Sequence, residues 1–249
     1  MITIKTEREI ALMREAGRIV AETHALLAES LKPGITTLEL DAIAEDYIRG
    51  KGAIPSFKNY NGFSGSICAS INDVVVHGIP SADTILKEGD IISFDVGAIL
   101  NGYHGDAART LPCGQVDQAA LDLIEVTRAS FEASLEYARE GYRLSDIGHA
   151  VQEYCESRGY GVVRDFCGHG IGTNMHEDPQ IPNYGRPGRG VRLKTGMCLA
   201  IEPMITEGTW EVTVQPDGWT VLTNDGKRAA HHENTIALTA DGPVILTAL

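Results

Sequence analysis

The sequence predicts an α+β protein made of two related halves, in which helices cover antiparallel strands. The first observation behind this prediction is a repeat. The segment Leu86–Asp95 returns, altered but readable, as Leu193–Glu202, 107 residues further along the chain. The second observation is Asn101-Gly102, a strong hairpin signal that joins two apolar strand-like runs. The third is that helical and strand-like segments form separate blocks, which favours α+β over a doubly wound parallel sheet.

The repeat extends into the helical segments that precede each copy. The further pairs at the same spacing are Gly34 and Gly141, Leu40 and Ile147, Tyr47 and Tyr154, and Gly52 and Gly159. Two amphipathic helices can align by chance, so the helical pairs alone leave that alternative open. The identical spacing of the strand segments favours a duplication. We therefore expect a single domain over residues 1–249, with pseudo-two-fold halves at about 1–112 and 115–249.

Each half is expected to begin with two helices. Thr6 can cap a helix over residues 7–31, whose acidic first turn suits the positive end of the helix dipole. Thr36 and Glu39 have the spacing of a capping box for the next helix. Residues 50–65, rich in Gly, Asn and Ser, predict an ordered loop over a site. The later elements are a hairpin of strands over 91–100 and 103–110, helices over 118–139 and 145–158, and strand and loop from 162 onward.

The composition is that of an ordinary globular protein, with 43% hydrophobic and 22% charged residues. The net charge of −13 argues against nucleic-acid binding, which needs a clustered basic face. The five cysteines are odd in number and include no Cys-x-x-Cys pair, which favours a reducing compartment over a disulfide framework. The N-terminus lacks the apolar core of a signal peptide, and no apolar run is long enough to span a bilayer. A cytoplasmic protein without membrane contact is therefore expected.

The hairpin brings two aspartates together. If Asn101-Gly102 is a two-residue turn, Ala108 lies opposite Asp95. Asp106 then lies diagonal to Asp95 on the same face, about 7 Å away between Cα atoms. Side chains can close that gap around one or two cations, and without cations the charges would repel and raise one pKa. Two solvated surface aspartates are the alternative, but the position of Asp95 inside an apolar run favours a buried pair.

Three further residues complete a candidate metal-binding set. The repeat makes Glu202 the counterpart of Asp95, and Glu233 opens another strand-like run, as expected for a hairpin partner. His169 lies between two glycines, which allow the backbone to approach a site closely. Two divalent cations would balance the charge of four carboxylates in a two-metal centre with ions about 3.5–4 Å apart. This mostly oxygen ligand set is more typical of Mn, Fe or Co than of a sulfur-rich structural zinc site.

These residues belong to segments that together resemble the type I methionine aminopeptidases, a peptidase family with the pita-bread fold, over essentially the whole chain. The segments are Cys68–Pro80, Gly102–Asp106, Cys167–Gly172, His176–Pro179, Ile201–Met204 and His232–Ile236. The resemblance implies a duplicated pita-bread fold of helices packed over antiparallel sheet. It also implies a role for each metal ligand. Asp106 and Glu233 would bridge the two ions. His169 and Glu202 complete one metal site, and Asp95 completes the other.

The resemblance further implies the activity of a methionyl aminopeptidase, a metalloprotease that hydrolyses the first peptide bond with a water or hydroxide activated by two metals. His77 and His176 would lie beside the scissile peptide, and Glu202 would shuttle the proton. The methionine side chain would lie in a pocket formed by Tyr60, Phe63, Cys68, Met175 and Trp219. From the residues alone, ordinary core or loop packing is the alternative for this pocket set. A crowded site around the second residue would account for the family's preference for small residues there.

Two positions depart from the family's pattern. The family commonly has Tyr-His-Gly, and this chain has Asn61 in place of that histidine. The family also commonly has Glu-His-Thr, and this chain has Asn234 in place of that histidine. Neither is a proposed ligand, so the departures bear only on the tuning and fine shape of the site. His104 shares the face of Asp106 by parity and could support the ligands. We expect three other histidines on solvated faces or in satisfied packing: His24, His149 and His231.

The implied substrates are N-terminal methionyl peptides and nascent chains. The implied cofactors are two divalent ions per chain, whether Co, Mn, Fe, Zn or Ni. A monomer is expected, and contact with the ribosome is left open. An aminopeptidase P or prolidase would share the ligand set, but such enzymes usually carry an additional N-terminal domain. A non-catalytic binding module of the same fold is the other alternative, although such proteins lose ligands and all five are present here.

Overall fold

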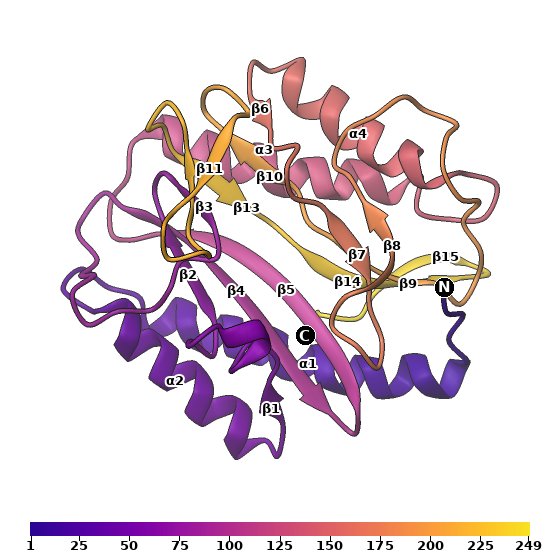
Figure 1. The fold of residues 1–249 in the computed structure, drawn as a ribbon, viewed down its shortest axis with the longest axis horizontal. Coiled ribbons are helices and arrows are strands. Elements are labelled where there is room, and N and C mark those ends of the chain that lie inside the picture. Colours follow the sequence, from indigo (N-terminus) through magenta and orange to yellow (C-terminus); the bar gives the residue numbers. More distant parts are fainter.

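The computed structural model describes residues 1–249, and its four α-helices form two pairs that flank the strands. The helices are α1 (Glu7–Ser30), α2 (Thr37–Gly50), α3 (Gln118–Leu135) and α4 (Leu144–Glu156). In Figure 1, α1 and α2 lie in the lower part of the molecule and α3 and α4 in the upper part. The first pair precedes the β4–β5 hairpin in the chain and the second pair follows it. The predicted α+β class, with helices over antiparallel sheet, is confirmed.

The helices of the first half begin where the sequence predicts. Thr6 and Thr36 both form complete capping boxes. Their hydroxyls accept from the backbone N–H groups of Glu9 at 3.3 Å and Glu39 at 3.1 Å. These contacts satisfy donors that a helix start would otherwise leave unpaired. In the second half α3 ends at Leu135, short of the predicted end, because the chain there goes into turns.

The strands pair antiparallel throughout. The short 3-10 helix η1 spans Tyr60–Gly62. The strands of the first half are β1 (Ile54–Pro55), β2 (Cys68–Ile71), β3 (Val74–Val76), β4 (Ile91–Leu100) and β5 (Tyr103–Pro112). Those of the second half are β6 (Gly161–Val162), β7 (Gly168–Gly170), β8 (Glu177–Ile181), β9 (Cys198–Ile201), β10 (Met204–Thr206), β11 (Val212–Val214), β12 (Val221–Thr223), β13 (Ala229–His231), β14 (Asn234–Thr239) and β15 (Gly242–Ile245).

The hairpin of β4 and β5 has the predicted register. Asn101 and Gly102 have φ angles of 53° and 81°, which a two-residue turn of type I′ requires at both positions. Asp95 pairs with Ala108, so Asp106 lies on the same face and diagonal to Asp95. β4 also pairs with β1 and β2, while β9 is the centre of a second sheet in the order β15-β14-β9-β7-β8.

Each half buries a core between its helices and its strands. In the first half, α1 and α2 pack against β4 and β5, and Leu40 and Phe94 are fully buried there. In the second half, α3 and α4 pack against β9 and β14, with Phe131 and Ile147 buried. Burial of one such side chain contributes about 1.5–3 kcal/mol, so these contacts hold the helix layers on the strands.

The structure supports the duplication residue by residue. The glycines of three repeat pairs all have positive φ: Gly34 and Gly141 at 94° and 97°, Gly52 and Gly159 at 76° and 85°, and Gly89 and Gly196 at 91° and 87°. Near the ends of α2 and α4, Lys51 lies over the ring of Tyr47 and Arg158 over the ring of Tyr154. Matching left-handed glycines and matching cation–π contacts at one spacing are not expected of helices that align by chance.

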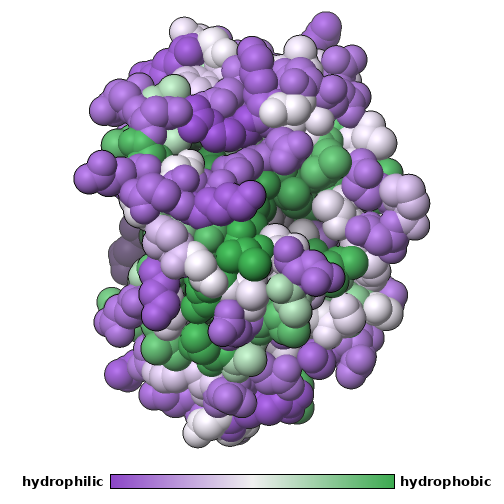
Figure 2. All heavy atoms as spheres, turned by 90° about the vertical axis from the view of Figure 1, so that its left-hand side faces the viewer, coloured by the Kyte–Doolittle hydropathy of each residue, from purple (hydrophilic) through white to green (hydrophobic).

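No helix of the structure is both long and apolar enough to cross a bilayer. The side of the molecule on the left of Figure 1 faces the viewer in Figure 2. There, apolar residues gather across the middle of the face, between hydrophilic regions above and below. Most of the visible surface is hydrophilic, in keeping with the net charge of −13.

Candidate metal centre

A cavity of about 140 Å³ lies between the two halves, and its lining combines acids and histidines with an apolar wall. Its polar lining residues are His77, Asp95, Asp106, His169, His176, Glu202 and Glu233. Its other lining residues are Phe57, Tyr60, Phe63, Cys68, Met175 and Trp219. The structure therefore brings together, around one cavity, every residue that the sequence nominated as ligand, catalytic group or pocket wall.

The acids reach the cavity from both halves. Asp95 and Asp106 project from the interiors of β4 and β5. Glu202 follows the end of β9, and Glu233 lies between β13 and β14. The Thr235 side chain joins the halves: its hydroxyl accepts from the Asp106 N–H at 3.0 Å and donates to the Asp106 carbonyl at 2.8 Å. The relative position of Asp106 and the Glu233 segment is thus fixed by hydrogen bonds.

Three ligand atoms form a compact cluster at the centre of the cavity. One side-chain atom each of Asp106, His169 and Glu233 lies within 4.8 Å of the other two, and all three residues are buried. His169 Nε2 is 3.9 Å from Asp106 Oδ2 and 3.6 Å from Glu202 Oε1. Its Nδ1–H donates to the Gly170 carbonyl at 2.9 Å. Because a carbonyl can only accept, the proton is on Nδ1, and the Nε2 lone pair faces the acids.

The acids of the cluster are hard to ionise together. Burial raises the pKa of Asp106 well above its usual range, and the charges of Glu233 and Asp95 add to this effect. Burial also raises the pKa values of Glu202 and Glu233, with further contributions from the neighbouring acids. The pKa of Asp95 is raised for the same main reason, burial. Groups packed this closely require cations between them if they are to be charged near neutral pH.

The donor set fits divalent metal ions. Asp95 Oδ1, Asp106 Oδ1 and Glu233 Oε1 are buried without any hydrogen-bond partner, which is costly unless another group satisfies them. Burial lowers the pKa of His169 to about 4, with a further contribution from His176, so its imidazole is neutral and available as a ligand. Burial raises the pKa of the nearby Cys68 thiol well above its usual range, which disfavours a thiolate ligand. Oxygen and imidazole donors of this kind suit Mn, Fe or Co.

Two further histidines lie at the mouth of the cluster. Burial lowers the pKa of His77 to about 4, and the pKa of His176 is also lowered by burial, so both are neutral near pH 7. The Tyr60 hydroxyl is 2.8 Å from His176 Nδ1, and the His176 and His169 ring centroids are 4.2 Å apart. His77 has a φ of 59°, in the left-handed region that non-glycine residues rarely adopt. Such strain is often found at functional sites.

The apolar wall lies beside the cluster. Phe57, Phe63, Cys68 and Met175 form one buried cluster, against which Tyr60 and Trp219 pack. The rings of Phe63 and Trp219 meet edge to face with centroids 5.2 Å apart. Phe57 is the one lining residue that the sequence reasoning missed. It belongs to the loop over residues 50–65 that was expected to cover the site, so its place there was the available signal.

The remaining histidines differ from one another. His104 is buried beside the site but lines no part of the cavity, and its Nδ1 is 2.9 Å from the Ser56 hydroxyl. His24 is satisfied in packing by the Ala107 carbonyl at 2.8 Å. The expectation for His231 is wrong. It is 1% exposed, and its Nε2 has no hydrogen-bond partner and lies 3.7 Å from Glu202 Oε2. His149, by contrast, is part-exposed near Glu153.

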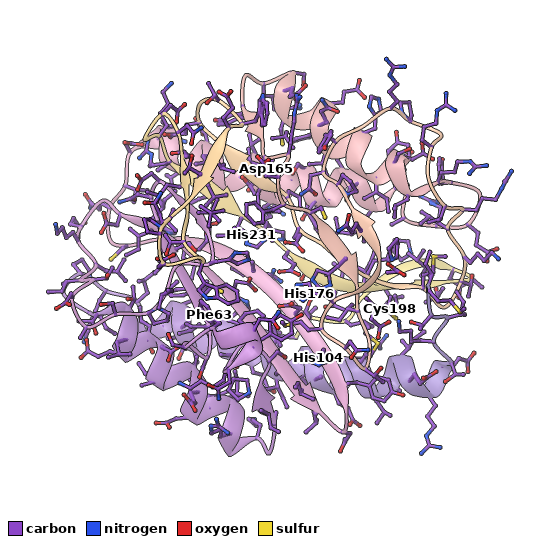
Figure 3. The ribbon with its side chains drawn as sticks, in the orientation of Figure 1. Phe63, His104, Asp165, His176, Cys198 and His231 are labelled. Carbon is purple, nitrogen blue, oxygen red and sulfur yellow. The ribbon has the colours of Figure 1, made fainter.

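Residues from distant parts of the chain meet in this region. In Figure 3, Phe63, His104, His176 and His231 all lie in the middle of the molecule, between the two helix pairs. They come from the segment after η1, from β5, from the loop before β8 and from β13. No local segment could form the site by itself, because its walls are assembled only when the halves pack together.

Comparison with known proteins identifies the class of protein that carries this fold and site. Residues 11–240 match the model of metallopeptidase family M24. Methionine aminopeptidase from Clostridium acetobutylicum is 59% identical over 247 residues, a match that covers 99% of both chains. Methionine aminopeptidase 1 from Bacillus subtilis is 57% identical, again over 99% of both chains.

Solved structures agree with these relatives. The crystal structure of methionine aminopeptidase from Thermotoga maritima matches with a TM-score of 0.98 at 46% identity, covering 100% of both chains. Prolidase from Pyrococcus furiosus shares the fold, with a TM-score of 0.81 at 24% identity, but the match covers only 65% of that chain. The fold and site therefore define a metallopeptidase of family M24. Within that family, the chain belongs to the type I methionine aminopeptidases.

Proposed function

We propose that this chain removes the N-terminal methionine from nascent proteins and peptides by metal-dependent hydrolysis, with a preference for a small second residue. One observation carries the proposal. The buried cluster of Asp106, His169 and Glu233 and the apolar wall around Phe63 and Trp219 line the same cavity. A hydrolytic centre and a side-chain pocket are therefore within reach of one bound residue.

Five side chains would hold two divalent ions. Asp106 and Glu233 would be shared between the ions, with His169 and Glu202 on one and Asp95 on the other. Bound there, the ions would supply Lewis acidity that polarises a carbonyl and makes water acidic enough to lose a proton near neutral pH. The buried, unpartnered oxygens of Asp95, Asp106 and Glu233 support this assignment.

The protein's own groups would move protons and orient the peptide. Glu202 would take a proton from the attacking water and pass it to the leaving amine, since its carboxylate lines the cavity at the cluster, 3.6 Å from His169 Nε2. His77 and His176 line the cavity and are neutral near pH 7 because burial lowers the pKa of each. As neutral imidazoles they could donate to the carbonyl oxygen on which charge develops.

The apolar wall would select the first residue. Phe63, Met175 and Trp219 offer an apolar surface to a thioether side chain, and the sulfur can contact the aromatic rings. An apolar pocket separates side chains that differ by one methylene by only about 1–3 kcal/mol. We therefore expect methionine to be preferred over shorter residues by a moderate factor, with crowding beyond the cavity disfavouring a large second residue.

The test is a peptide assay on protein first stripped of metal with a chelator. Turnover of Met-Gly-x and Met-Ala-Ser should be absent without metal and should return on titration with Mn, Co, Fe, Zn or Ni, with bound metal counted alongside. A matched Ala-Gly-x peptide should be cleaved far more slowly. Cleavage of Xaa-Pro peptides in place of Met-Ala-Ser would assign the chain a prolidase-type activity. Undiminished cleavage by the stripped protein would refute the metal-dependent mechanism.

We further propose a single catalytic domain with pseudo-two-fold halves, acting as a monomer in the cytoplasm. The matching glycines and cation–π pairs of the two halves support the internal duplication. Five free cysteines are consistent with a reducing compartment. Sedimentation of the metal-loaded protein at micromolar concentration should give one species of about the 26.8 kDa chain mass.

A further inference from the structure

Arg109 lies directly behind the metal centre. This β5 residue is largely enclosed, and its guanidinium makes four hydrogen bonds. Nη1 donates to the carbonyl oxygens of Ala108, at 2.8 Å, and Glu233. Nη2 donates to Asn234 Oδ1 at 2.5 Å and to the Thr247 carbonyl at 3.5 Å. One side chain of the first half thus holds the backbone that carries a ligand from the second half.

The partners of this guanidinium are all neutral oxygens. Arg109 forms no ion pair, in contrast to surface arginines such as Arg18 and Arg228. Its positive charge is therefore held by hydrogen bonds and not by an ion pair, while acids line the neighbouring cavity. A partly buried charge is costly unless its surroundings offset it, and here neutral oxygens and the neighbouring acids supply that offset.

Glu233 needs such support because no strand continues through it. It lies between β13 and β14, and its backbone is held by paired hydrogen bonds with Ala108, at 3.0 and 3.3 Å. The Arg109 guanidinium adds a further hydrogen bond to the Glu233 carbonyl oxygen. Ala108 and Arg109 follow Asp106 closely on β5, so the position of Glu233 is set by the strand that carries Asp106.

Asn234 orients the guanidinium. Its Oδ1 accepts from Arg109 Nη2 and, at 2.9 Å, from the Thr247 hydroxyl. Its Nδ2 lies 3.3 Å from His232 Nε2, which can accept. An amide presents an acceptor and a donor at the same time, so Asn234 can bind the arginine on one side and the histidine on the other. Arg109 and Asn234 thus form a matched pair next to Glu233.

We propose that Arg109 is a positioning residue that holds Glu233 at the spacing from Asp106 at which both carboxylates can share bound metal, with Asn234 aiming its guanidinium. Arg109 does not line the cavity. It acts through Glu233, in the way that outer hydrogen-bond partners orient ligands at other metal sites. Arginine suits the task because its planar fork can bind two acceptors in fixed directions, whereas a lysine ammonium cannot.

The test measures metal binding by the stripped protein, because this role rests on the proposed metal-dependent function. Arg109→Met should weaken Mn(II) affinity in calorimetry about 10–100-fold and lower kcat by a similar factor, with KM changed less than about threefold. Arg109→Lys keeps the charge but loses the fork, so it should recover only part of the affinity. Arg18→Met removes an arginine that contacts Glu22 at 3.0 Å on an exposed face of α1, and it should leave affinity unchanged.

Two outcomes would overturn the role of Arg109. Mn(II) affinity of Arg109→Met within twofold of the wild type, with only the melting temperature lowered, would make the arginine a structural element. Full recovery by Arg109→Lys would show that charge alone matters. If Arg109→Met does not fold, Asn234→Ala tests the same geometry and should weaken affinity severalfold, whereas unchanged affinity would count against the pair. If Mn(II) affinity depends on Arg109 as expected but the wild type cleaves no Met-Gly-x peptide, the proposed function fails and the positioning role stands.

Discussion

The two halves of the molecule present their acids in different ways. In the first half, Asp95 and Asp106 lie inside uninterrupted strands of ten residues each, diagonal to one another across a tight hairpin. In the second half, Glu202 and Glu233 lie in gaps between short strands. The first half therefore holds its two ligands by a regular ladder. In the second half, Glu233 is held by backbone hydrogen bonds to Ala108 and by Arg109, and the Glu202 carbonyl accepts from the Asn183 side chain.

The register of the second half gives a reason for its gaps. The strand pairs on either side are Ile201 with Asn234 and Met204 with His231. Continued through the gap, this register sets Glu202 directly opposite Glu233, an arrangement that is destabilising for like charges. The register is kept there by the His232 N–H, which donates to the Pro203 carbonyl at 3.1 Å, while Pro203 has no N–H to donate in return and so interrupts the ladder.

The largest effect is expected from a substitution in the first half, where the ligands lie in a regular strand ladder. Asp106→Asn should abolish turnover, a loss beyond the ~100-fold typical for an outer partner of a ligand, because it removes a shared carboxylate. The same change should raise the melting temperature of the metal-free protein near pH 7. Burial and the neighbouring acids raise the pKa of Asp106, so folding must either keep an unfavourable charge there or take up a proton, and an amide avoids both costs. About 1 kcal/mol of relief corresponds to roughly 2–4 °C at this chain length. Peptide turnover, bound metal and thermal melting are measured on one preparation.

Glu233→Gln is the matched change on the irregular side. It should also abolish turnover and relieve repulsion, but its segment depends on side-chain contacts, so we expect a smaller gain in the melting temperature. Normal metal content and turnover in Asp106→Asn would falsify the assignment of Asp106 as a shared ligand.

The next effect concerns the two histidines that flank the cluster, one from each half. His77→Ala should lower kcat by about 10²-fold, the usual loss for one donor to a developing oxyanion, with metal content unchanged. His176→Ala should act similarly, and Tyr60→Phe should lower kcat less, because it removes only the hydroxyl that contacts His176. Metal content and kcat are compared for each variant. A loss of metal in step with activity would make His77 a ligand instead.

Most of the first half could be predicted from the sequence, because its helix starts and its hairpin register depend on residues close together in the chain. The Asn101-Gly102 turn alone fixed the register of Asp95, and the capping residues fixed the helix starts. Pro203, which has no N–H to donate, is a local signal for the gap after Glu202, whereas the gap at Glu233 depends on which strand faces it and could not be predicted in this way. The resemblance to a known family, not periodicity, nominated the pocket residues.

The misses have physical causes of the same kind. The burial of His231 against Glu202 depends on how β13 pairs with β10 across the chain, which its polar sequence neighbourhood concealed. The Arg109 fork binds groups more than a hundred residues away, so its role was visible only after folding. Long-range contacts of polar groups are the part that sequence patterns leave undetermined.

A third effect concerns the ion pair of Lys5 and Glu177, which joins the two halves next to His176. The Lys5 ammonium is 2.6 Å from Glu177 Oε2, and the two side chains are only 5% and 8% exposed. Lys5→Met leaves Glu177 buried without its partner and should cost about 3–5 kcal/mol in urea unfolding. His77 needs no such pair, since its neighbour Gly78 packs tightly against the Ala69 backbone.

The double variant separates charge from packing. Lys5→Met with Glu177→Gln should recover much of the lost stability, because no buried charge then remains unpaired. A double variant as unstable as Lys5→Met alone would show that the lost lysine packing, not the unpaired carboxylate, is responsible.

The smallest effect is expected at a repeat position that carries an acid in one half and an amide in the other. In α2, Glu45 accepts from the Ser66 hydroxyl and the Arg49 guanidinium, each at 2.7 Å. At the matching position of α4, Gln152 Oε1 accepts from the Gly185 N–H at 3.0 Å. The Ser66 hydrogen bond, followed by that of Arg49, lowers the pKa of Glu45 from 4.5 to about 2. Only the first half should therefore depend on pH at this contact.

A carboxyl group whose pKa is lower in the folded state stabilises the fold above its unfolded pKa and loses that effect as pH falls through the folded value. Glu45→Gln should therefore cost about 1 kcal/mol near pH 7, and the difference from the wild type should shrink between pH ~4.5 and ~2. Gln152→Ala should cost a similar amount at every pH in this range. Thermal melts of the three proteins at matched pH measure both differences. A Glu45→Gln difference that stays constant down to pH ~2.5 would mean that the Ser66 hydroxyl contact, rather than the charge, fixes this loop, and the two halves would then be chemically equivalent here.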